Sequence, residues 1–284
     1  MEWCNVFGKI WKIELNVYKV IKIMYSNSNM NPFSAWLKYC NEKQLFEELL
    51  SDKIGLLNIS KNTGTQKILD VGCGSGETST RILNVLNKRS IPFEYTALDP
   101  FQKNIDAFKI KMGELSMSDI KYVLSTFEKY EASKNTYDLL VACQVLYYFD
   151  DIKSMIEKML DMAKETIIVH HGSNGIHTFH QKFLPYVRTT DHIMSTYSEV
   201  QNMLDEINSD GKYKIQFFKF VCQVDIKACK DENSEDGNNL LTFFLGKDIS
   251  EIPVDVRKEM HNYFKQNYDK YMEHDQGVFF VTKI

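Results

Sequence analysis

Short apolar runs alternate with amphipathic segments along the middle of the chain. Five runs have the length of a strand, and Asp138–Cys143 is almost continuously apolar, as in a strand covered on both faces. The other four are Lys67–Val71, Phe93–Leu98, Lys121–Leu124 and Thr166–Val169. Helical periodicity is found at Thr78–Asn87, Gln102–Lys111 and Asp151–Ala163. This alternation predicts a parallel sheet with right-handed helical crossovers.

Helical patterns precede this region and a looser mixture follows it. We expect two helices across residues 31–59, where aromatic and leucine side chains recur at helical spacing. Beyond residue 172 we expect helices at Ser195–Ile207, Leu240–Leu245 and Val254–Tyr268, strands at Ile215–Val224 and Val278–Thr282, and an exposed loop at Lys230–Asn239. The fold predicted is α/β: a Rossmann-like, seven-stranded, mostly parallel sheet with helices on both faces and a helical N-terminal lobe.

Composition disfavours several classes of function. Of the 284 residues, 44% are hydrophobic and 25% are charged, as in an ordinary globular enzyme. The formal net charge is −4 without a basic block, which argues against nucleic acid as a partner. Charges interrupt the apolar runs of the first 30 residues, so we expect no membrane span. Six cysteines without a Cys-x-x-Cys pair favour a reducing, cytoplasmic setting, and we expect a monomer.

A glycine-rich turn follows the first apolar run. Gly72, Gly74 and Gly76 stand between that run and a helical segment. Glycine suits such a turn because the backbone bends sharply and a ligand must approach it without meeting a Cβ. The next run ends in Asp99, whose carboxylate is placed to accept hydrogen bonds from both ribose hydroxyls of an adenosine. The plainer alternatives are an ordinary turn and a helix N-cap at Asp99.

The run Asp70–Glu77 with Asp99 downstream resembles the cofactor motif of class I S-adenosylmethionine-dependent methyltransferases. The resemblance implies S-adenosylmethionine as the cofactor, with the loop after the third strand beside the adenine and the loop after the fourth beside the methionine portion and the substrate. The implied cofactor-binding residues are Gly72, Gly74, Gly76, Asp99, Asn104, Thr126, Phe127 and Cys143.

Further motifs resemble the histamine N-methyltransferase family over roughly residues 33–284. They are the run Gln144–Phe149, the segment Gly172–Gly175, the stretch Asp231–Leu245 and the pair Asn41-Glu42. The resemblance implies that Glu42 and Gln144 contact an imidazole, and it places an asparagine of the family at Asp275. It implies pocket walls at Phe33, Tyr147, Tyr148, His180 and Phe244.

The acid of the cofactor site is Asp99 where the family has a glutamate, and three pocket positions also depart from that family. Ile176 and His180 stand where the family has tryptophans, and Asp275 has a carboxylate in place of an amide. A pocket with two acids still favours a cationic amine. We therefore expect methyl transfer to a nitrogen of a small amine, with histamine or a related imidazole amine first. A same-fold methyltransferase for another small amine or acid, a non-catalytic cofactor-binding protein and a nicotinamide-dependent oxidoreductase remain open, although the glycine spacing disfavours the last.

Plainer roles remain open for several of these residues. Glu42 could stabilise a helix N-terminus electrostatically, Tyr147 and Tyr148 could pack in the core, and Asp275 could begin a strand. A second set of side chains suggests a metal site, namely His170, His171, His177 and His180. Because no cysteine or acid cluster completes such a site, we expect no metal.

The domain division follows from the same pattern. Residues 1–30 are interpreted as an N-terminal extension, and 31–284 as one methyltransferase domain. Within it we assign 31–60 to a helical substrate lobe, 61–172 to the cofactor-binding core, and 173–284 to substrate-side elements and closing strands.

Overall fold

The computed structural model describes residues 32–117, 119–187 and 195–284, so the extension expected at 1–30 lies outside the described residues. The chain divides into two compact units. The sheet unit contains the described parts of Glu42–Gly172, Met194–Val221 and Asp275–Ile284. The helical unit contains the described parts of Met1–Asn41, Ser173–Ile193 and Cys222–His274.

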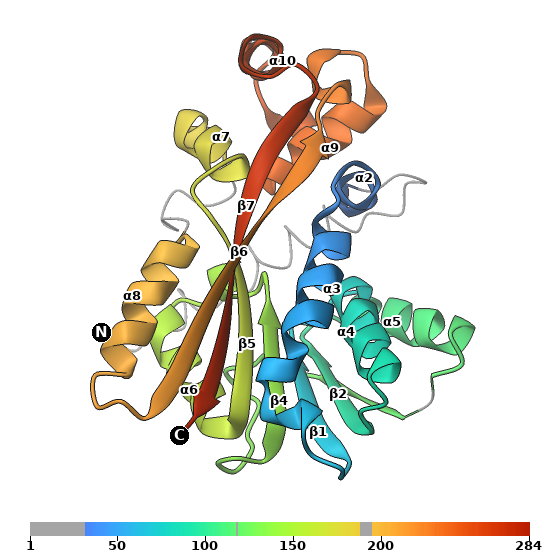
Figure 1. Cartoon of the computed structure of the whole chain (residues 1–284). Helices are drawn as coiled ribbons and strands as arrows, with labels where there is room; N and C mark the ends of the chain where they lie inside the picture. The colour runs from blue at the N-terminus through green and yellow to red at the C-terminus, as the bar shows by residue number, and fades with distance from the viewer. Residues whose placement is uncertain (1–31, 118, 188–194) are drawn as a thin grey trace, which may run out of the picture. The chain divides into compact units, whose positions relative to one another are not determined.

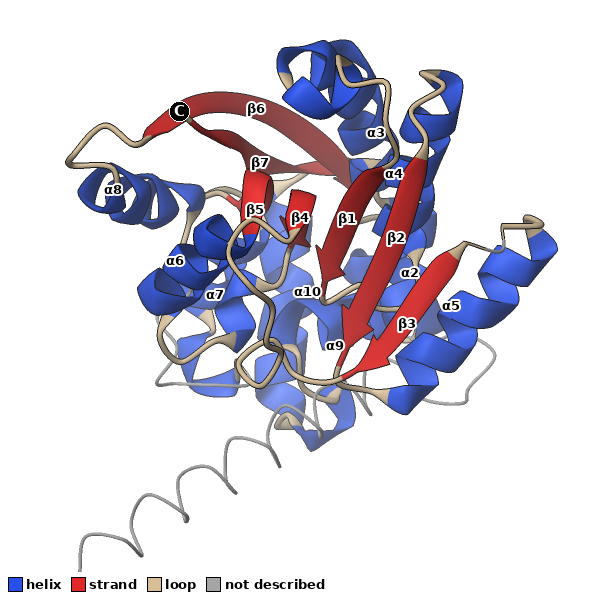
Figure 2. Ribbon diagram, turned by 90° about the horizontal axis from the view of Figure 1, so that it is seen from below, coloured by secondary structure: helices blue, strands red, loops and turns tan. Residues whose placement is uncertain are grey.

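A seven-stranded sheet has the order β3-β2-β1-β4-β5-β7-β6. Its strands are β1 Gln66–Val71, β2 Phe93–Asp99, β3 Ile120–Leu124, β4 Tyr137–Cys143, β5 Ala163–His171, β6 Tyr213–Asp225 and β7 Tyr271–Lys283. The first five pair in parallel, and β7 runs antiparallel to β5. Figure 2 shows β1, β2 and β3 side by side. The predicted Rossmann-like, mostly parallel sheet is therefore confirmed.

Helices of the sheet unit cover both faces of these strands (Figure 1). One face carries α3 Glu42–Lys53, α4 Glu77–Lys88 and α5 Gln102–Glu114, and the other carries α6 Ile152–Met162 and α8 Tyr197–Ile207. Successive side chains of a strand point to opposite faces, so Ile68 packs with α3 and α4 while Leu69 packs with α6 and α8. Both faces are thus apolar, as the continuous run in β4 predicts.

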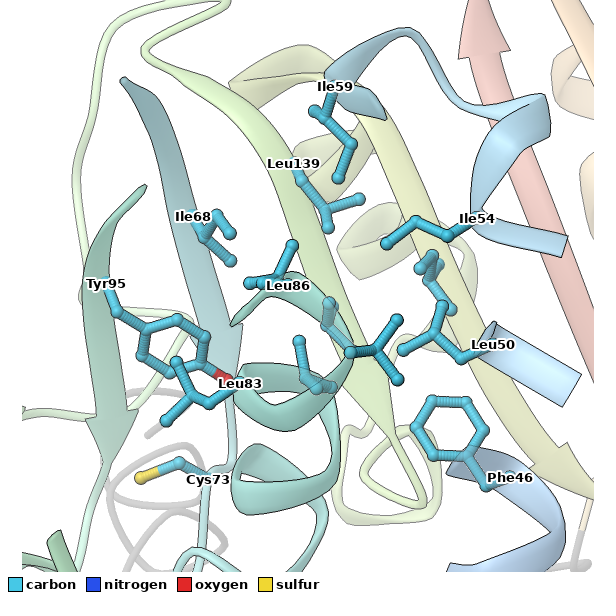
Figure 3. Close-up of a cluster of buried hydrophobic side chains, with 14 of the residues drawn as sticks. Phe46, Leu50, Ile54, Ile59, Ile68, Cys73, Leu83, Leu86, Tyr95 and Leu139 are labelled. Carbon is cyan, nitrogen blue, oxygen red and sulfur yellow. The ribbon is translucent and has the colours of Figure 1, made fainter. Parts of the chain in front are cut away.

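The cluster on the α3 face forms the larger part of the core. Figure 3 shows Phe46 and Leu50 of α3, Leu83 and Leu86 of α4 and strand side chains such as Ile68 in one cluster. Phe46 and Leu50 are each only 1% exposed. Burying a side chain of this size stabilises the fold by roughly 1.5–3 kcal/mol. This packing positions the first turn of α3, where Glu42 lies.

The helical unit contains α2 Pro32–Tyr39, α7 Ile176–Lys182, α9 Glu235–Leu245 and α10 Val254–Asn267. The prediction of a loop at Lys230–Asn239 is wrong for its second half, where α9 begins. Ser234 caps this helix, because its Oγ accepts a hydrogen bond from Gly237 N at 3.1 Å. The two N-terminal helices are present, but α2 and α3 belong to different units. None of the helices in the described part of the chain is both long and apolar enough to cross a bilayer.

Candidate active site

The glycine-rich turn at the end of β1 adopts conformations that suit glycine. Gly72, Gly74 and Gly76 have φ angles of 70°, 55° and 84°, in the left-handed region. A Cβ added to Gly72 would lie 2.6 Å from Val145 Cγ2, and one added to Gly76 would overlap the ring of Phe108. The left-handed backbone and the packing against Val145 and Phe108 therefore require glycine in this turn, which lies at the carboxyl edge of the sheet.

Asp99 ends β2 beside this turn and is only 4% exposed. Its Oδ2 accepts a hydrogen bond from Gly74 N at 3.0 Å, and its Oδ1 accepts from Phe101 N at 2.9 Å and Asn104 Nδ2 at 3.0 Å. Burial raises the pKa of Asp99, and these three donors oppose the shift. The N-cap of α5 is Phe101, so Asp99 is not the helix cap. Its carboxylate is fixed against the turn with acceptor capacity left for ribose hydroxyls.

The loop after β3 lies next to Asp99. Leu124 pairs with Asp99 in the sheet, and Ser125 N donates to Asp99 O at 3.2 Å. Thr126 is half-buried, whereas Phe127 is 3% exposed and packs with Phe149 at a centroid distance of 6.0 Å. Thr126 comes directly after Ser125, which contacts Asp99, so it lies at the carboxyl edge of the sheet. The Phe127 ring belongs to the core cluster beside α6.

Asp70 is a buried acid beneath the turn to which the sequence analysis assigned no separate role. Its Oδ2 accepts hydrogen bonds from Ser79 of α4 and from the Tyr95 hydroxyl of β2, the latter at 2.7 Å. Burial raises the pKa of Asp70 to about 6. The carboxylate connects β1, β2 and α4 around the glycine turn, and its place inside the Asp70–Glu77 motif was the available signal.

We expect Asp70→Asn to change how stability depends on pH. A carboxyl of pKa about 6 in the folded protein binds its proton more tightly than the unfolded chain does, at about 3.9. The free energy of unfolding of wild type relative to Asp70→Asn should therefore rise as pH falls from 7 to 4, by roughly 2–3 kcal/mol in total. Urea unfolding of both proteins across this range measures the difference, and parallel curves would contradict it.

The end of β4 carries a constrained glutamine. Gln144 has a φ of 55°, which is uncommon for a residue with a side chain, and its N–H donates to Val169 O at 2.9 Å. Its side-chain Nε2 donates to Oε1 of Gln276. Cys143, just before it, is half-buried, and burial raises the pKa of its thiol to about 11, so the group stays protonated.

Glu42 is the first residue of α3 and is 4% exposed. Lys43 Nζ lies 2.7 Å from its Oε1. Both charges act on the Cys143 thiol, where Lys43 opposes the rise in pKa caused by burial and Glu42 adds to it. These couplings place the Glu42–Lys43 pair near the carboxyl end of β4. The position also fits the plainer role of an acid in a first helical turn.

Two neighbouring residues of β7 point to opposite faces of the sheet. Gln276 alternates with Val278 and Phe280 of the cluster on the α3 face, whereas Asp275 alternates with Phe279 of the cluster on the α8 face. Gln276, which the sequence analysis did not select, therefore contacts Gln144. The period of two along the strand was the signal that could have found it.

Asp275 lies in a polar network on the α8 face and is 1% exposed. Tyr197 OH donates to its Oδ2 at 3.0 Å, and Lys219 Nζ lies 2.9 Å from the same oxygen. Its carbonyl accepts from Gly172 N at 2.8 Å, and a Cβ on Gly172 would overlap its carboxylate. The acid that replaces the amide of the resembled family is thus compensated by a lysine.

Aromatic rings and imidazoles gather where β4 and β5 end. Tyr147 lies in the short 3-10 turn Leu146–Tyr148, with its ring 5.9 Å from His170 and 5.8 Å from His171. Tyr148 packs against the cluster on the α8 face. His170 is fully buried, with its Nε2 2.6 Å from Ser195 O, and burial lowers its pKa to about 4. His170 is therefore neutral at physiological pH.

The remaining expected pocket residues belong to the helical unit. His180 is 6% exposed, and its Nε2 makes a hydrogen bond with Phe244 O. The Phe244 ring packs edge-on against Trp36 at 6.2 Å, and Phe33 lies 6.2 Å from Phe243. In this unit Phe244 and His180 contribute to an aromatic core.

Potential metal ligands do not gather in the structure. Nowhere in residues 32–117, 119–187 and 195–284 do three or more His, Cys, Asp or Glu side chains form a group that could hold a metal ion. The histidines noted in the sequence are placed separately: His170 and His171 end β5, whereas His177 and His180 lie on α7.

Residues 68–166 match a family model described as a methyltransferase domain. This segment is similar to methyltransferase domains, and the sheet around it has the Rossmann-like fold of methyltransferases. The matched segment runs from β1 into β5 and includes the glycine turn, Asp99 and Gln144. The turn and Asp99 fit S-adenosylmethionine: bare backbone admits the cofactor closely, and an anchored carboxylate is available to the ribose.

One curated relative of this chain is a malonyl-[acyl-carrier protein] O-methyltransferase from Ilyobacter polytropus. It is 26% identical over 200 residues, which cover 70% of this chain and 66% of that protein. Among solved structures, YcgJ of Bacillus subtilis has a TM-score of 0.55 at 13% identity over 82% of this chain and 99% of its own. The plantazolicin methyltransferase BpumL, in complex with SAH, has a TM-score of 0.53 at 13% identity over 96% of this chain and 98% of its own. These structures share its fold.

Proposed function

We propose that this methyltransferase transfers a methyl group from S-adenosylmethionine to a nitrogen of a small amine, with histamine or a related imidazole amine as first candidate. When bound, the sulfonium cofactor supplies an already activated methyl group. The glycine turn and Asp99 hold its adenosine portion. The protein then has to align the acceptor nitrogen with the methyl group and exclude water.

The charge of the site carries this proposal. Among the ionisable groups described above in the sheet unit, carboxylates outnumber lysines. They are Glu42, Asp70, Asp99 and Asp275 against Lys43 and Lys219. Both of these lysines are already paired, Lys43 with Glu42 and Lys219 with Asp275, so an acceptor carboxylate would find no cation among these groups. Because burying a charge is costly without an opposite partner, this arrangement favours an amine over a carboxylate.

The acceptor nitrogen must present a neutral lone pair. An imidazole, with an unperturbed pKa of about 6.5, is mostly neutral at pH 7, so no strong base is required. Glu42 is the candidate to accept the N–H of the far ring nitrogen, and Gln144 the candidate to orient the ring. The Tyr147 face can stabilise an ammonium group by roughly 0.5–2 kcal/mol.

A carboxyl group is the second candidate acceptor. The observation that favours it is the curated relative, whose name describes O-methylation of a malonyl group on acyl-carrier protein. A third reading is a protein that binds S-adenosylmethionine without turnover. Both differ from the amine proposal in which acceptor, if any, becomes methylated.

A panel of acceptors with labelled S-adenosylmethionine tests the proposal. It contains histamine, other imidazole amines, catecholamines, polyamines and malonyl-acyl carrier protein. Methylation of an imidazole amine at nitrogen is the expected result. Turnover of malonyl-acyl carrier protein alone would overturn it in favour of the carboxyl acceptor. Tight cofactor binding with no turnover across the panel would favour the non-catalytic reading.

We expect Glu42→Ala and Gln144→Ala each to lower kcat/KM for the amine by roughly 10- to 100-fold, because each loses a hydrogen bond to the acceptor. Affinity for S-adenosylhomocysteine, measured by calorimetry, should stay within about twofold of wild type, since neither residue belongs to the glycine turn. The matched control is Glu48→Ala, an exposed acid on the same helix. Unchanged kinetics in both site variants would remove this acceptor site.

A further inference from the structure

Gln144 is held at both its backbone and its side chain. Its positive φ of 55° is costly for a non-glycine residue, and its N–H is bound to Val169 O at 2.9 Å. Its side-chain Nε2 donates to Gln276 Oε1. With the amide nitrogen committed to this contact, the carbonyl oxygen of Gln144 is the end of the amide left to accept a hydrogen bond.

Gln276 is fully buried in β7, 0% exposed, on the sheet face shared with Val278 and Phe280. Within the described chain its Nε2 finds no hydrogen-bond partner. A buried donor without a partner destabilises the folded state, so an apolar side chain would stabilise the core more at this position. The placement of an amide here points to a ligand that borders the Gln144–Gln276 pair.

We propose that Gln276 is a positioning residue of the acceptor site. It holds the Gln144 amide with the carbonyl oxygen presented to the acceptor, and so selects acceptors that carry an amine N–H group in addition to the ring N–H assigned to Glu42. A bare carboxylate brings no hydrogen for that oxygen and is disfavoured. This inference rests on the proposed function and assigns the specificity of the same site to a second residue.

A double-mutant cycle separates positioning from a structural role. Gln276→Leu should lower kcat/KM for the methylated amine by about tenfold in the wild-type background, because the hydrogen bond that orients the Gln144 amide is lost. In a Gln144→Leu background the same change should alter kcat/KM by less than about twofold, because no amide remains to be positioned. Equal losses in both backgrounds would overturn the proposal.

Two further variants sharpen the cycle. Gln276→Glu retains an acceptor for Gln144 Nε2 and should keep most of the activity lost in Gln276→Leu; a loss as large as that of Gln276→Leu would contradict the stated direction of the hydrogen bond. Gln66→Leu is the matched control, since Gln66 is a glutamine 3% exposed in β1 that donates to Gly64 O at 2.5 Å. It should lower stability with kcat/KM unchanged.

A readout without turnover keeps this inference distinct from the proposed function. The side-chain amide signals of Gln144, assigned by their loss in Gln144→Leu, should exchange with solvent at least several-fold faster in Gln276→Leu than in wild type. No turnover of any amine by wild type contradicts the proposed function. Unchanged amide exchange contradicts the positioning of Gln144 whatever the substrate proves to be.

Discussion

Asp99→Ala should weaken binding of S-adenosylhomocysteine by roughly 10- to 100-fold. Three protein donors already bind the carboxylate, which leaves one acceptor position for a ribose hydroxyl. A hydrogen bond to a charged group contributes about 1.5–3 kcal/mol, where 1.4 kcal/mol is tenfold in affinity. The change also removes the acceptor of Gly74 N, which helps to hold the turn. Isothermal titration calorimetry measures the effect.

The control for this prediction is Asp106→Ala. Asp106 is an exposed acid on α5 that accepts a hydrogen bond from Gln102 at 2.7 Å, so its loss changes the net charge equally. Its affinity for S-adenosylhomocysteine should equal that of wild type. If Asp99→Ala binds within about threefold of wild type, the ribose contact assigned to Asp99 is wrong.

Gly76→Ala should lower the free energy of unfolding by roughly 2–5 kcal/mol. A left-handed conformation costs about 1–2 kcal/mol for a residue with a Cβ, and overpacking a core adds about 1–3 kcal/mol. Both apply at Gly76, whose φ is 84° and whose added Cβ would overlap the Phe108 ring. Urea unfolding measures the loss.

Two other glycines separate these contributions. Gly211 has a φ of 72° and nothing within 4 Å of an added Cβ, so Gly211→Ala should show the conformational cost alone. Gly113 lies in α5, also with nothing within 4 Å, and Gly113→Ala should raise stability by up to about 1 kcal/mol. If Gly76→Ala loses no more free energy of unfolding than Gly211→Ala, the Phe108 ring moves to accommodate the added Cβ.

The sheet could be predicted from sequence because its signals are local. Apolar runs predict the interior strands. The distance in sequence from the glycine turn to Asp99 is set by the neighbouring helix and strand, so both can be found from one short stretch of chain. The long strands β6 and β7 were expected shorter than they are, and α7 was not assigned at all. The local sequence predicts these elements poorly, because strand pairing and packing against other parts of the fold determine where they begin and end.

The acceptor site was harder to predict because it depends on contacts between distant strands. Gln144 and Gln276 are brought together by the position of β7, which no local pattern reveals. Asp275 was selected by resemblance, but the sequence did not show that its negative charge is compensated by Lys219 of β6. Likewise His180 and Phe244 were expected as pocket walls, and their hydrogen bond and packing became visible only in three dimensions.

The place of β7 has a consequence for how the molecule is made on the ribosome. Among the seven strands it is the last to be synthesised, yet it lies between β5 and β6 in the sheet. Until it is translated, the edge of β5 is open and β6 has no neighbour from this sheet. A premature stop codon just upstream of Tyr271 would therefore remove an interior strand together with Gln276, leaving two exposed edges prone to aggregation.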